Sequence, residues 1–210
     1  LSTLQGGILA RDMQKVDPVL VYQAVGRDAG WLAASAALAK RDEADAPHLI
    51  YTPERVFDAE KFLADVKRCH DKYGFVSIVC GEGIKYADGT PVSASQTQDK
   101  FSNIEFGAMG GSSVAFNLHK MISSTYGWRG EFQITESLPM CAIDRAVQQD
   151  LDEASLCGCA AVKLADEGQT GAMVTLERQS NAPYKVTTGT TKLCDVAVRA
   201  KPMPENFLNA

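Results

Sequence analysis

The sequence has 210 residues, of which 45% are hydrophobic and 22% are charged, values typical of a soluble globular protein with one or two domains. Its net charge of −5 argues against binding of nucleic acid through overall electrostatics, and no apolar run approaches the ~20 residues of a membrane-spanning helix. The six cysteines form no C-x-x-C pair and show no Cys/His spacing of a metal site, so we expect a reduced, cytoplasmic protein.

Apolar runs and helix-forming segments alternate along the chain. The apolar runs predict strands at 19–25, 48–52, 75–83, 171–178 and 184–189. The remaining patterned segments predict helices at 30–41, 58–74, 112–127, 145–168 and 193–200. Asp58 is expected to cap the helix at 58–74, and Gly74 is expected to end it. Because most strands are separated by a dozen or more residues that include a helix, we expect an α/β fold with a mainly parallel sheet.

The end of the first predicted strand carries Val25, Gly26 and Arg27, directly before a helix. Ligands of open parallel sheets bind where strands end and helices begin, because unpaired backbone N–H groups carry partial positive charge there. Gly26 would let the backbone approach a ligand, and Arg27 would add a forked cation for a phosphate. The simpler alternative is a strand-to-helix turn with a solvated arginine.

The next two predicted strands also end in charged residues. Glu54 follows Pro53, and Glu82 lies between two glycines. A carboxylate at this edge of the sheet could accept hydrogen bonds from sugar hydroxyls, or it could cap a helix or form part of a turn. Together the three strand ends suggest a site for a polyol or a phosphate. The polar segment at 86–111 is predicted to be a long loop of the kind that often carries function.

Tyr126 and Arg129 lie three residues apart near the end of the helix predicted at 112–127. Their hydroxyl and guanidinium groups could bind one phosphate together, or they could be a packed ring and a surface cation. His119 lies on an apolar helix, where a structural histidine is expected more often than a catalytic one. The sequence contains no P-loop, G-x-S-x-G, H-E-x-x-H or complete G-x-G-x-x-G motif, so no element that binds a phosphoryl donor is visible.

Several segments, taken in order, resemble the phosphofructokinase family, and more closely its pyrophosphate-dependent branch. They include QAVGRDAGWLAASAALA, APHLIYTPER, VSIVCGEGIK, DKFSNIEFGAMGG and YGWRGEFQITESLPMCAIDRA. Each motif is modest, but the ordered set is specific and covers nearly the whole chain. The resemblance implies a three-layer fold around a parallel sheet, and transfer of a phosphoryl group from pyrophosphate or ATP to the 1-hydroxyl of fructose 6-phosphate with Mg²⁺.

The resemblance also implies roles for individual residues. The family's M-G-R tripeptide, which touches the sugar and the transferring phosphate, matches Val25, Gly26 and Arg27, so Arg27 is the expected catalytic residue. The family's proline-glutamate pair, which holds sugar hydroxyls, is matched to Glu54. The Y-x-x-R signature, which grips the 6-phosphate, is matched to Tyr126 and Arg129.

The sequence departs from the family pattern in two places. Gln133 is followed by Ile134, where many members have an arginine, so a cation is missing or is replaced by another such as Arg145. The glycine-rich donor loop and the segment with the catalytic aspartate have no counterpart, and the sequence starts at Leu1 without an initiator methionine. We therefore expect a partial chain that corresponds to the C-terminal half of the family.

These departures define the expected organisation. Residues 1–138 are predicted to form the fructose 6-phosphate domain, and residues 139–210 a segment that crosses back toward the donor domain, followed by a tail. The family resemblance implies a homo-oligomer, with Mg²⁺ bound mainly by the donor and by the half that this sequence lacks, and no metal ligand in this chain. The alternative is a non-catalytic subunit that senses sugar phosphates.

Overall fold

The computed structural model describes residues 16–93, 113–135, 138–197 and 199–208. The chain folds as two compact units: Leu1–Pro139 together with Lys201–Ala210, and Met140–Ala200. The C-terminal tail, which the sequence-based division assigned to the second segment, groups with the first unit. The segment 94–112, which holds most of the long loop predicted at 86–111, lies outside the described residues.

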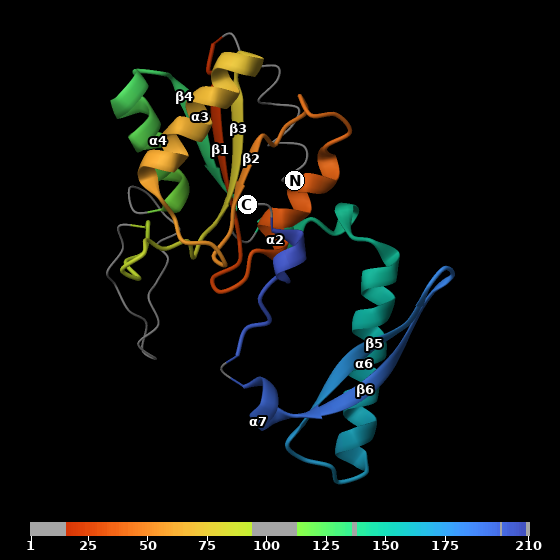
Figure 1. Cartoon of the computed structure of the whole chain (residues 1–210). Helices are drawn as coiled ribbons and strands as arrows, with labels where there is room; N and C mark the ends of the chain where they lie inside the picture. The colour runs from red at the N-terminus through yellow and green to blue at the C-terminus, as the bar shows by residue number, and fades with distance from the viewer. Residues whose placement is uncertain (1–15, 94–112, 136–137, 198, 209–210) are drawn as a thin grey trace. The chain divides into compact units, whose positions relative to one another are not determined.

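A four-stranded parallel sheet forms the centre of the first unit (Figure 1). Its strands are β1 (Val19–Ala24), β2 (Leu49–Tyr51), β3 (Val76–Gly81) and β4 (Gly130–Ile134), in the order β2-β3-β1-β4. Val19 pairs with Val76 on one side and with Gly130 on the other, so the amino ends of β1, β3 and β4 are level. The predicted α/β fold with a mainly parallel sheet is confirmed.

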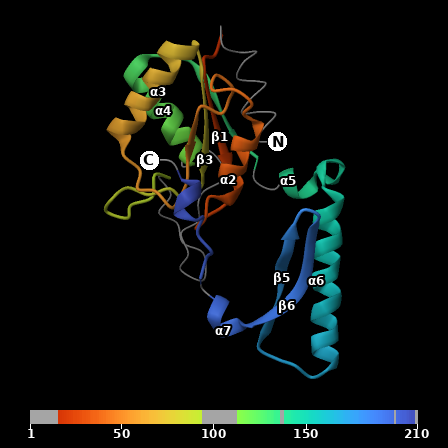
Figure 2. The ribbon, with the colours of Figure 1, turned by 45° about the vertical axis from the view of Figure 1, so that its right-hand side comes forward.

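Helices cover both faces of this sheet (Figure 2). On one face lie α3 (Ala59–Tyr73) and α4 (Val114–Tyr126), and on the other lies α2 (Trp31–Ser35), which continues as the 3-10 turn η2 (Ala36–Ala39). Side chains alternate along β1: Val21 packs with α3 and α4, whereas Tyr22 packs with α2. The buried side chains between the sheet and its two helical layers form the hydrophobic core of the unit. Each fully buried Val or Leu there contributes about 1.5–3 kcal/mol to folding.

The ends of α3 follow the sequence prediction. The Asp58 side chain accepts hydrogen bonds from the backbone N–H groups of Glu60 and Lys61, at 2.9 and 3.0 Å. Gly74 ends the helix with a φ of 80°, a left-handed conformation that favours glycine. The helix predicted at 30–41 is instead interrupted, because α2 has five residues and passes into a 3-10 turn.

Strand β4 is not predicted from the sequence. Among the described strands it lies at the edge of the sheet beside β1, and its residues are half-buried or exposed. Its sequence GEFQI therefore lacks the continuous apolar run that marks the buried strands. A Cβ added to Gly130 would lie 2.4 Å from the Val19 carbonyl oxygen, so the absence of a side chain allows β4 to approach β1.

One long helix and a β-hairpin are the main elements of the second unit. After α5 (Leu138–Cys141) come the 3-10 turn η3 (Ile143–Arg145), α6 (Gln148–Asp166), β5 (Ala172–Asn181), β6 (Tyr184–Lys192) and α7 (Leu193–Val196). The two strands predicted here do form, but they pair with each other in an antiparallel sheet. None of the described residues of this unit is buried, and Val147, Leu151 and Val162 are 58%, 41% and 70% exposed.

Candidate functional site

The turns that follow β1, β2 and β3 meet at one edge of the parallel sheet. They comprise residues 25–30, 52–55 and 81–83, and they include most of the residues singled out in the sequence. Parallel strands bring these turns together because their carboxyl ends share one edge, which is where ligands of open α/β sheets bind.

Gly26 has a backbone conformation that strongly favours glycine. Its φ is 141°, and a Cβ added at this position would lie 2.6 Å from the carbonyl oxygen of Ala29. The backbone N–H of Gly26 donates a hydrogen bond to Oε1 of Glu82, at 3.2 Å. The turn after β1 is therefore tightly folded on itself and held against the carboxylate that follows β3.

Two further glycines allow the turns to pack against one another. A Cβ added to Gly83 would lie 1.6 Å from the Arg27 carbonyl oxygen, so no side chain fits there without a backbone shift. A Cβ added to Gly81 would lie 3.0 Å from Cδ of Pro53. The half-buried Glu82 thus lies between two glycines that bring the three turns together, with the exposed Arg27 on the neighbouring turn.

Glu54 is bound to backbone groups of the protein itself. Its Oε1 accepts hydrogen bonds from the N–H groups of Gly30 and Met203, at 2.8 and 3.0 Å, and its Oε2 is buried. Burial opposes ionisation, but the two N–H donors hold the pKa of Glu54 below its ordinary value. This arrangement corresponds to the capping alternative of the sequence analysis, except that the carboxylate binds the N–H before α2.

The start of α4 also lies near the carboxyl end of β1. The backbone N–H of Ala115 donates to Oε1 of the buried Gln23, at 3.1 Å, and Ser113 Oγ accepts from the N–H of Phe116, at 3.1 Å. These two N–H groups of the first helical turn are thus satisfied by side chains of the protein. The amino end of α4 therefore contributes the partial positive charge of its helix dipole to this edge of the sheet.

The structure does not bring Tyr126 and Arg129 to this edge. Both precede β4, and because Gly130 pairs with Val19, they lie at the amino end of the sheet. Six residues of strand at about 3.3 Å each separate the two edges by roughly 20 Å. The resemblance groups Tyr126 and Arg129 with the sugar-phosphate residues at the strand ends, but the structure places these two residues at the opposite edge of the sheet.

Both residues have partners at the opposite edge. The Tyr126 hydroxyl donates to the carbonyl oxygen of Leu63, at 3.0 Å, and its ring stacks on Trp128 with the centroids 4.5 Å apart. The Arg129 side chain is 78% exposed, and its Nε lies 3.5 Å from Oδ1 of Asp17. These contacts are the packed ring and the surface cation that the sequence analysis left open as the alternative.

Comparison with known proteins identifies the family of the chain. A sequence model of a protein family, described as phosphofructokinase, matches residues 9–161. The chain belongs to the phosphofructokinase family.

Two relatives of this phosphofructokinase-family chain are pyrophosphate–fructose 6-phosphate 1-phosphotransferases. The protein of Halomonas elongata is 37% identical over 190 residues, and that of Xanthomonas campestris pv. campestris is 36% identical over 191 residues. Each match covers 90% of this chain and 44% of the relative, so the chain spans less than half the length of these relatives.

A solved structure shares the fold over nearly the whole chain. The pyrophosphate-dependent phosphofructokinase of Nitrosospira multiformis superposes with a TM-score of 0.79 at 33% identity. The match covers 99% of this chain and 48% of that chain. The predicted resemblance to the pyrophosphate-dependent branch is thereby confirmed.

Magnesium is the cofactor that the family resemblance implies, and the carboxylates at the strand ends do not fit a dedicated site for it. Mg²⁺ prefers several oxygen ligands around one position. In the described part of the chain, no group of three or more His, Cys, Asp or Glu side chains could hold a metal ion. Glu54 gives one oxygen to two backbone N–H groups, and Glu82 gives one to Gly26.

Both carboxylates at the strand ends of this phosphofructokinase-family chain bind the turn that carries Arg27: Glu82 through the N–H of Gly26, directly before Arg27, and Glu54 through the N–H of Gly30, three residues after it. The strand ends in the sequence point to both residues as possible acceptors for sugar hydroxyls, whereas the family resemblance matches this role to Glu54. The signal that separates them is the G-E-G context, because flanking glycines permit the close backbone packing seen at Gly81 and Gly83. In contrast, Pro53 before Glu54 gives no information about the donors that the carboxylate meets.

His119 behaves as a structural residue. Its ring packs against Phe132, with the centroids 5.8 Å apart, and burial lowers its pKa. It lies on α4, away from the turns of the candidate site, in agreement with the sequence interpretation.

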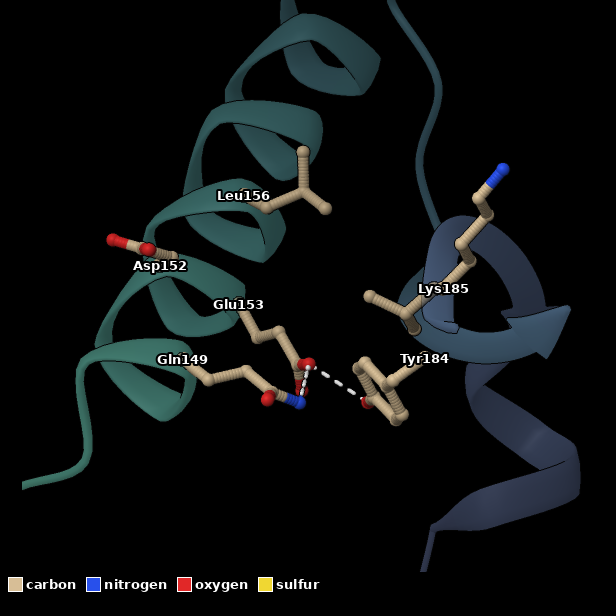
Figure 3. Close-up of a pocket in the computed structure, with 7 residues that line it drawn as sticks. Gln149, Asp152, Glu153, Leu156, Tyr184 and Lys185 are labelled. Carbon is tan, nitrogen blue, oxygen red and sulfur yellow. Dashed lines mark hydrogen bonds between the residues drawn. The ribbon is translucent and has the colours of Figure 1, made fainter. Parts of the chain in front are cut away.

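The second unit contains a separate open hollow of about 380 Å³ between α6 and β6 (Figure 3). Glu153 accepts hydrogen bonds there from the Tyr184 hydroxyl at 2.7 Å and from Gln149 Nε2 at 3.0 Å. None of the predicted site residues lines this hollow, and its central carboxylate joins the helix to the hairpin.

Among the described helices of both units, none has the length and hydrophobicity that a bilayer span requires.

Proposed function

We propose that this chain supplies the fructose 6-phosphate site of a pyrophosphate-dependent phosphofructokinase. The observation that carries the proposal is the contact between Gly26 and Glu82, which sets a carboxylate beside the turn that presents Arg27. A sugar phosphate needs hydrogen-bond acceptors for its hydroxyls and a cation for its phosphate oxygens, and this edge offers both.

The roles follow from the chemistry of each group. Glu82 accepts hydrogen bonds from sugar hydroxyls, and the backbone of Val25 and Gly26 lies against the sugar. Arg27 neutralises charge on the phosphoryl group that moves from pyrophosphate to the 1-hydroxyl. Phosphoryl transfer depends mainly on positioning and charge neutralisation, so a cation at this place acts without forming a covalent bond. The resemblance matched Glu54 and the Tyr126–Arg129 pair to sugar and phosphate contacts. In this proposal Glu54 instead binds the turn that bears Arg27, through the N–H of Gly30, and the Tyr126–Arg129 pair at the opposite edge of the sheet does not contact the sugar phosphate.

The exposed side chains of the second unit support a role for it as a packing surface. Val147, Leu151 and Val162 leave apolar surface in water, and such surface is usually covered by another protein segment. We assign residues 140–200 to the segment that crosses toward the donor-binding part of the family, which supplies pyrophosphate and magnesium.

Titration calorimetry of the chain with fructose 6-phosphate tests the sugar site without any donor. Fructose is the control ligand, and it should bind at least about tenfold more weakly because it lacks the phosphate. Arg27→Gln should weaken binding about tenfold or more, since a charged hydrogen bond contributes about 1.5–3 kcal/mol. Arg41→Gln, which removes the same charge from an exposed loop position, should leave the affinity within about twofold. Equal affinities of the Arg27→Gln and parent chains would contradict the assignment.

A second function is a non-catalytic subunit that binds sugar phosphate and reports its concentration. Ile134 favours it, because this position follows Gln133 where many members of the family have an arginine for the sugar phosphate. The two functions differ in turnover of the full-length protein: the enzyme transfers phosphate from pyrophosphate to fructose 6-phosphate, whereas the sensor binds the sugar phosphate without transfer.

A further inference from the structure

The chain returns to the first unit at its C-terminal end, where residues 201–208 pack against the start of α2 and the turn after β2. We call these residues the C-terminal strap. Met203 is the buried anchor of the strap, with 5% of its surface exposed. The strap ends in the 3-10 turn η4 (Glu205–Phe207), which lies beside α2 in both views (Figures 1 and 2).

The strap is attached through contacts to three residues, Trp31, Arg55 and Glu54, which lie in the turns of the candidate site or directly after them. Nε1 of Trp31 donates to the carbonyl oxygen of Lys201 at 2.9 Å, and the Trp31 ring lies 6.2 Å from that of Phe207. Arg55 and Glu205 form an exposed ion pair at 2.6 Å. The third contact, from the Met203 N–H to Glu54, is the one that continues into the site.

One oxygen of Glu54 serves both the strap and the turn that bears Arg27. Oε1 accepts from Met203 N at 3.0 Å and from Gly30 N at 2.8 Å, so the two donors converge on a single atom. The fit around this point is tight, because a Cβ added to Gly30 would lie 2.8 Å from Oε2 of Glu54. Only Asp28 and Ala29 separate Gly30 from Arg27.

We propose that Glu54 is a positioning residue through which the docked C-terminal strap orders the turn at residues 26–30. When the strap is in place, the Met203 N–H binds the carboxylate and keeps it directed at Gly30. When the strap is removed, Glu54 loses one of its two donors, and the turn that presents Arg27 becomes more mobile. That this turn binds a sugar phosphate rests on the proposed function, whereas the coupling itself does not.

Amide hydrogen exchange of the chain without ligand tests the coupling. Truncation after Ala200 leaves Glu54 and Gly30 unchanged, yet it should speed exchange at residues 26–31 about tenfold or more. Glu54→Ala should have the same effect, and adding it to the truncation should speed exchange no further. Glu54→Gln keeps an oxygen acceptor and should stay within about threefold of the parent. The amides of β3, which report on global unfolding, should change less than about threefold in all variants.

A matched control and a second variant make the result decisive. Glu205→Gln makes the same carboxylate-to-amide change in the exposed ion pair with Arg55, and it should leave exchange at residues 26–31 unchanged. If the truncated chain does not fold, Met203→Pro removes the strap's N–H donor alone and should speed exchange in the same region. Unchanged exchange at residues 26–31 after loss of the strap or of this donor, or equal acceleration in β3 of a folded variant, would overturn the coupling.

Titration with fructose 6-phosphate then separates the two proposals. In the parent chain it reports on the sugar site, and in Glu54→Ala it should show binding weakened by about threefold to tenfold. If the parent chain fails to bind, the proposed function is wrong. The exchange data decide the coupling in either case.

Discussion

The backbone N–H of Gly26 donates to Oε1 of Glu82 at 3.2 Å, which joins two turns that are 56 residues apart in the sequence. This contact depends on the identity of both residues. A residue other than glycine would be strained at a φ of 141°, and a shorter side chain than glutamate would not reach the N–H. The contact uses one lone pair of the carboxylate, so further acceptor positions remain for a ligand hydroxyl.

Substitution of Gly83 tests how tightly the three turns interlock. Gly83→Ala should destabilise the protein by about 2–3 kcal/mol, because the new Cβ would lie 1.6 Å from the Arg27 carbonyl oxygen and force a backbone shift. Gly158→Ala is the control: it lies within α6 with no atom near an added Cβ, and it should stabilise the chain by about 0.5–1 kcal/mol. Urea denaturation measures both, and equal effects of the two changes would contradict the packing described here.

Much of the fold and part of the site could be predicted because they depend on local signals. The buried strands β1 and β3 are continuous apolar runs, and Asp58 and Gly74 mark the ends of α3. The carboxyl end of β1 could be located in the same way. The position of a site residue relative to the sheet could be predicted only where the strand next to it was recognised in the sequence.

The missed strand β4 accounts for the misplaced pair. Without β4, Tyr126 and Arg129 are recognised only as residues near the end of a helix, and nothing indicates at which edge of the sheet that end lies. The register between Val19 and Gly130 assigns them to the opposite edge, and no local pattern encodes that register. The partner of Glu54 was equally hidden, because Met203 lies 149 residues away in the sequence.

Tyr126 is expected to act in packing, so its hydroxyl should affect stability and not ligand binding. Tyr126→Phe removes the hydrogen bond to the Leu63 carbonyl oxygen and should destabilise the protein by about 0.5–1.5 kcal/mol, while the stacking on Trp128 is kept. Thermal unfolding measures the loss. Affinity for fructose 6-phosphate should stay within about twofold of the parent chain. A tenfold loss of affinity without loss of stability would contradict this prediction and would indicate that Tyr126 contacts the ligand.

Arg129 should contribute little to either property. Arg129→Gln removes an ion pair with Asp17 in which the arginine is 78% exposed, and such pairs contribute about 0–1 kcal/mol. We expect a change in unfolding free energy below about 1 kcal/mol and no change in affinity for fructose 6-phosphate. Calorimetry of Arg129→Gln beside Arg27→Gln compares the same chemical change at the two edges of the sheet. Equal weakening by both would show that the edge described here is not the whole site.

His48 should make the protein sensitive to acid. Burial lowers the pKa of His48 to about 4, since the ring is packed between Tyr73 and Phe75 and Nδ1 accepts a hydrogen bond from the Ser77 N–H at 2.9 Å. Among the charged groups nearby, Lys40 favours the neutral ring and Asp45 opposes it. A protonated Nδ1 cannot accept that bond, so the folded state holds the imidazole neutral.

The sign of the pH effect follows from which state binds the proton. Between pH 6.5 and about 4 the unfolded chain protonates His48 and the folded chain does not, so stability is full above pH 6.5 and falls as the pH drops toward 4. Allowing for partial solvent screening, we expect His48 to account for a loss on the order of 2 kcal/mol between pH 7 and pH 4.5. Urea denaturation across this range measures the loss, and His48→Asn, which does not titrate there, is the control. If the parent chain and His48→Asn lose stability in parallel, His48 is protonated equally in both states and the packing inferred from its contacts is wrong.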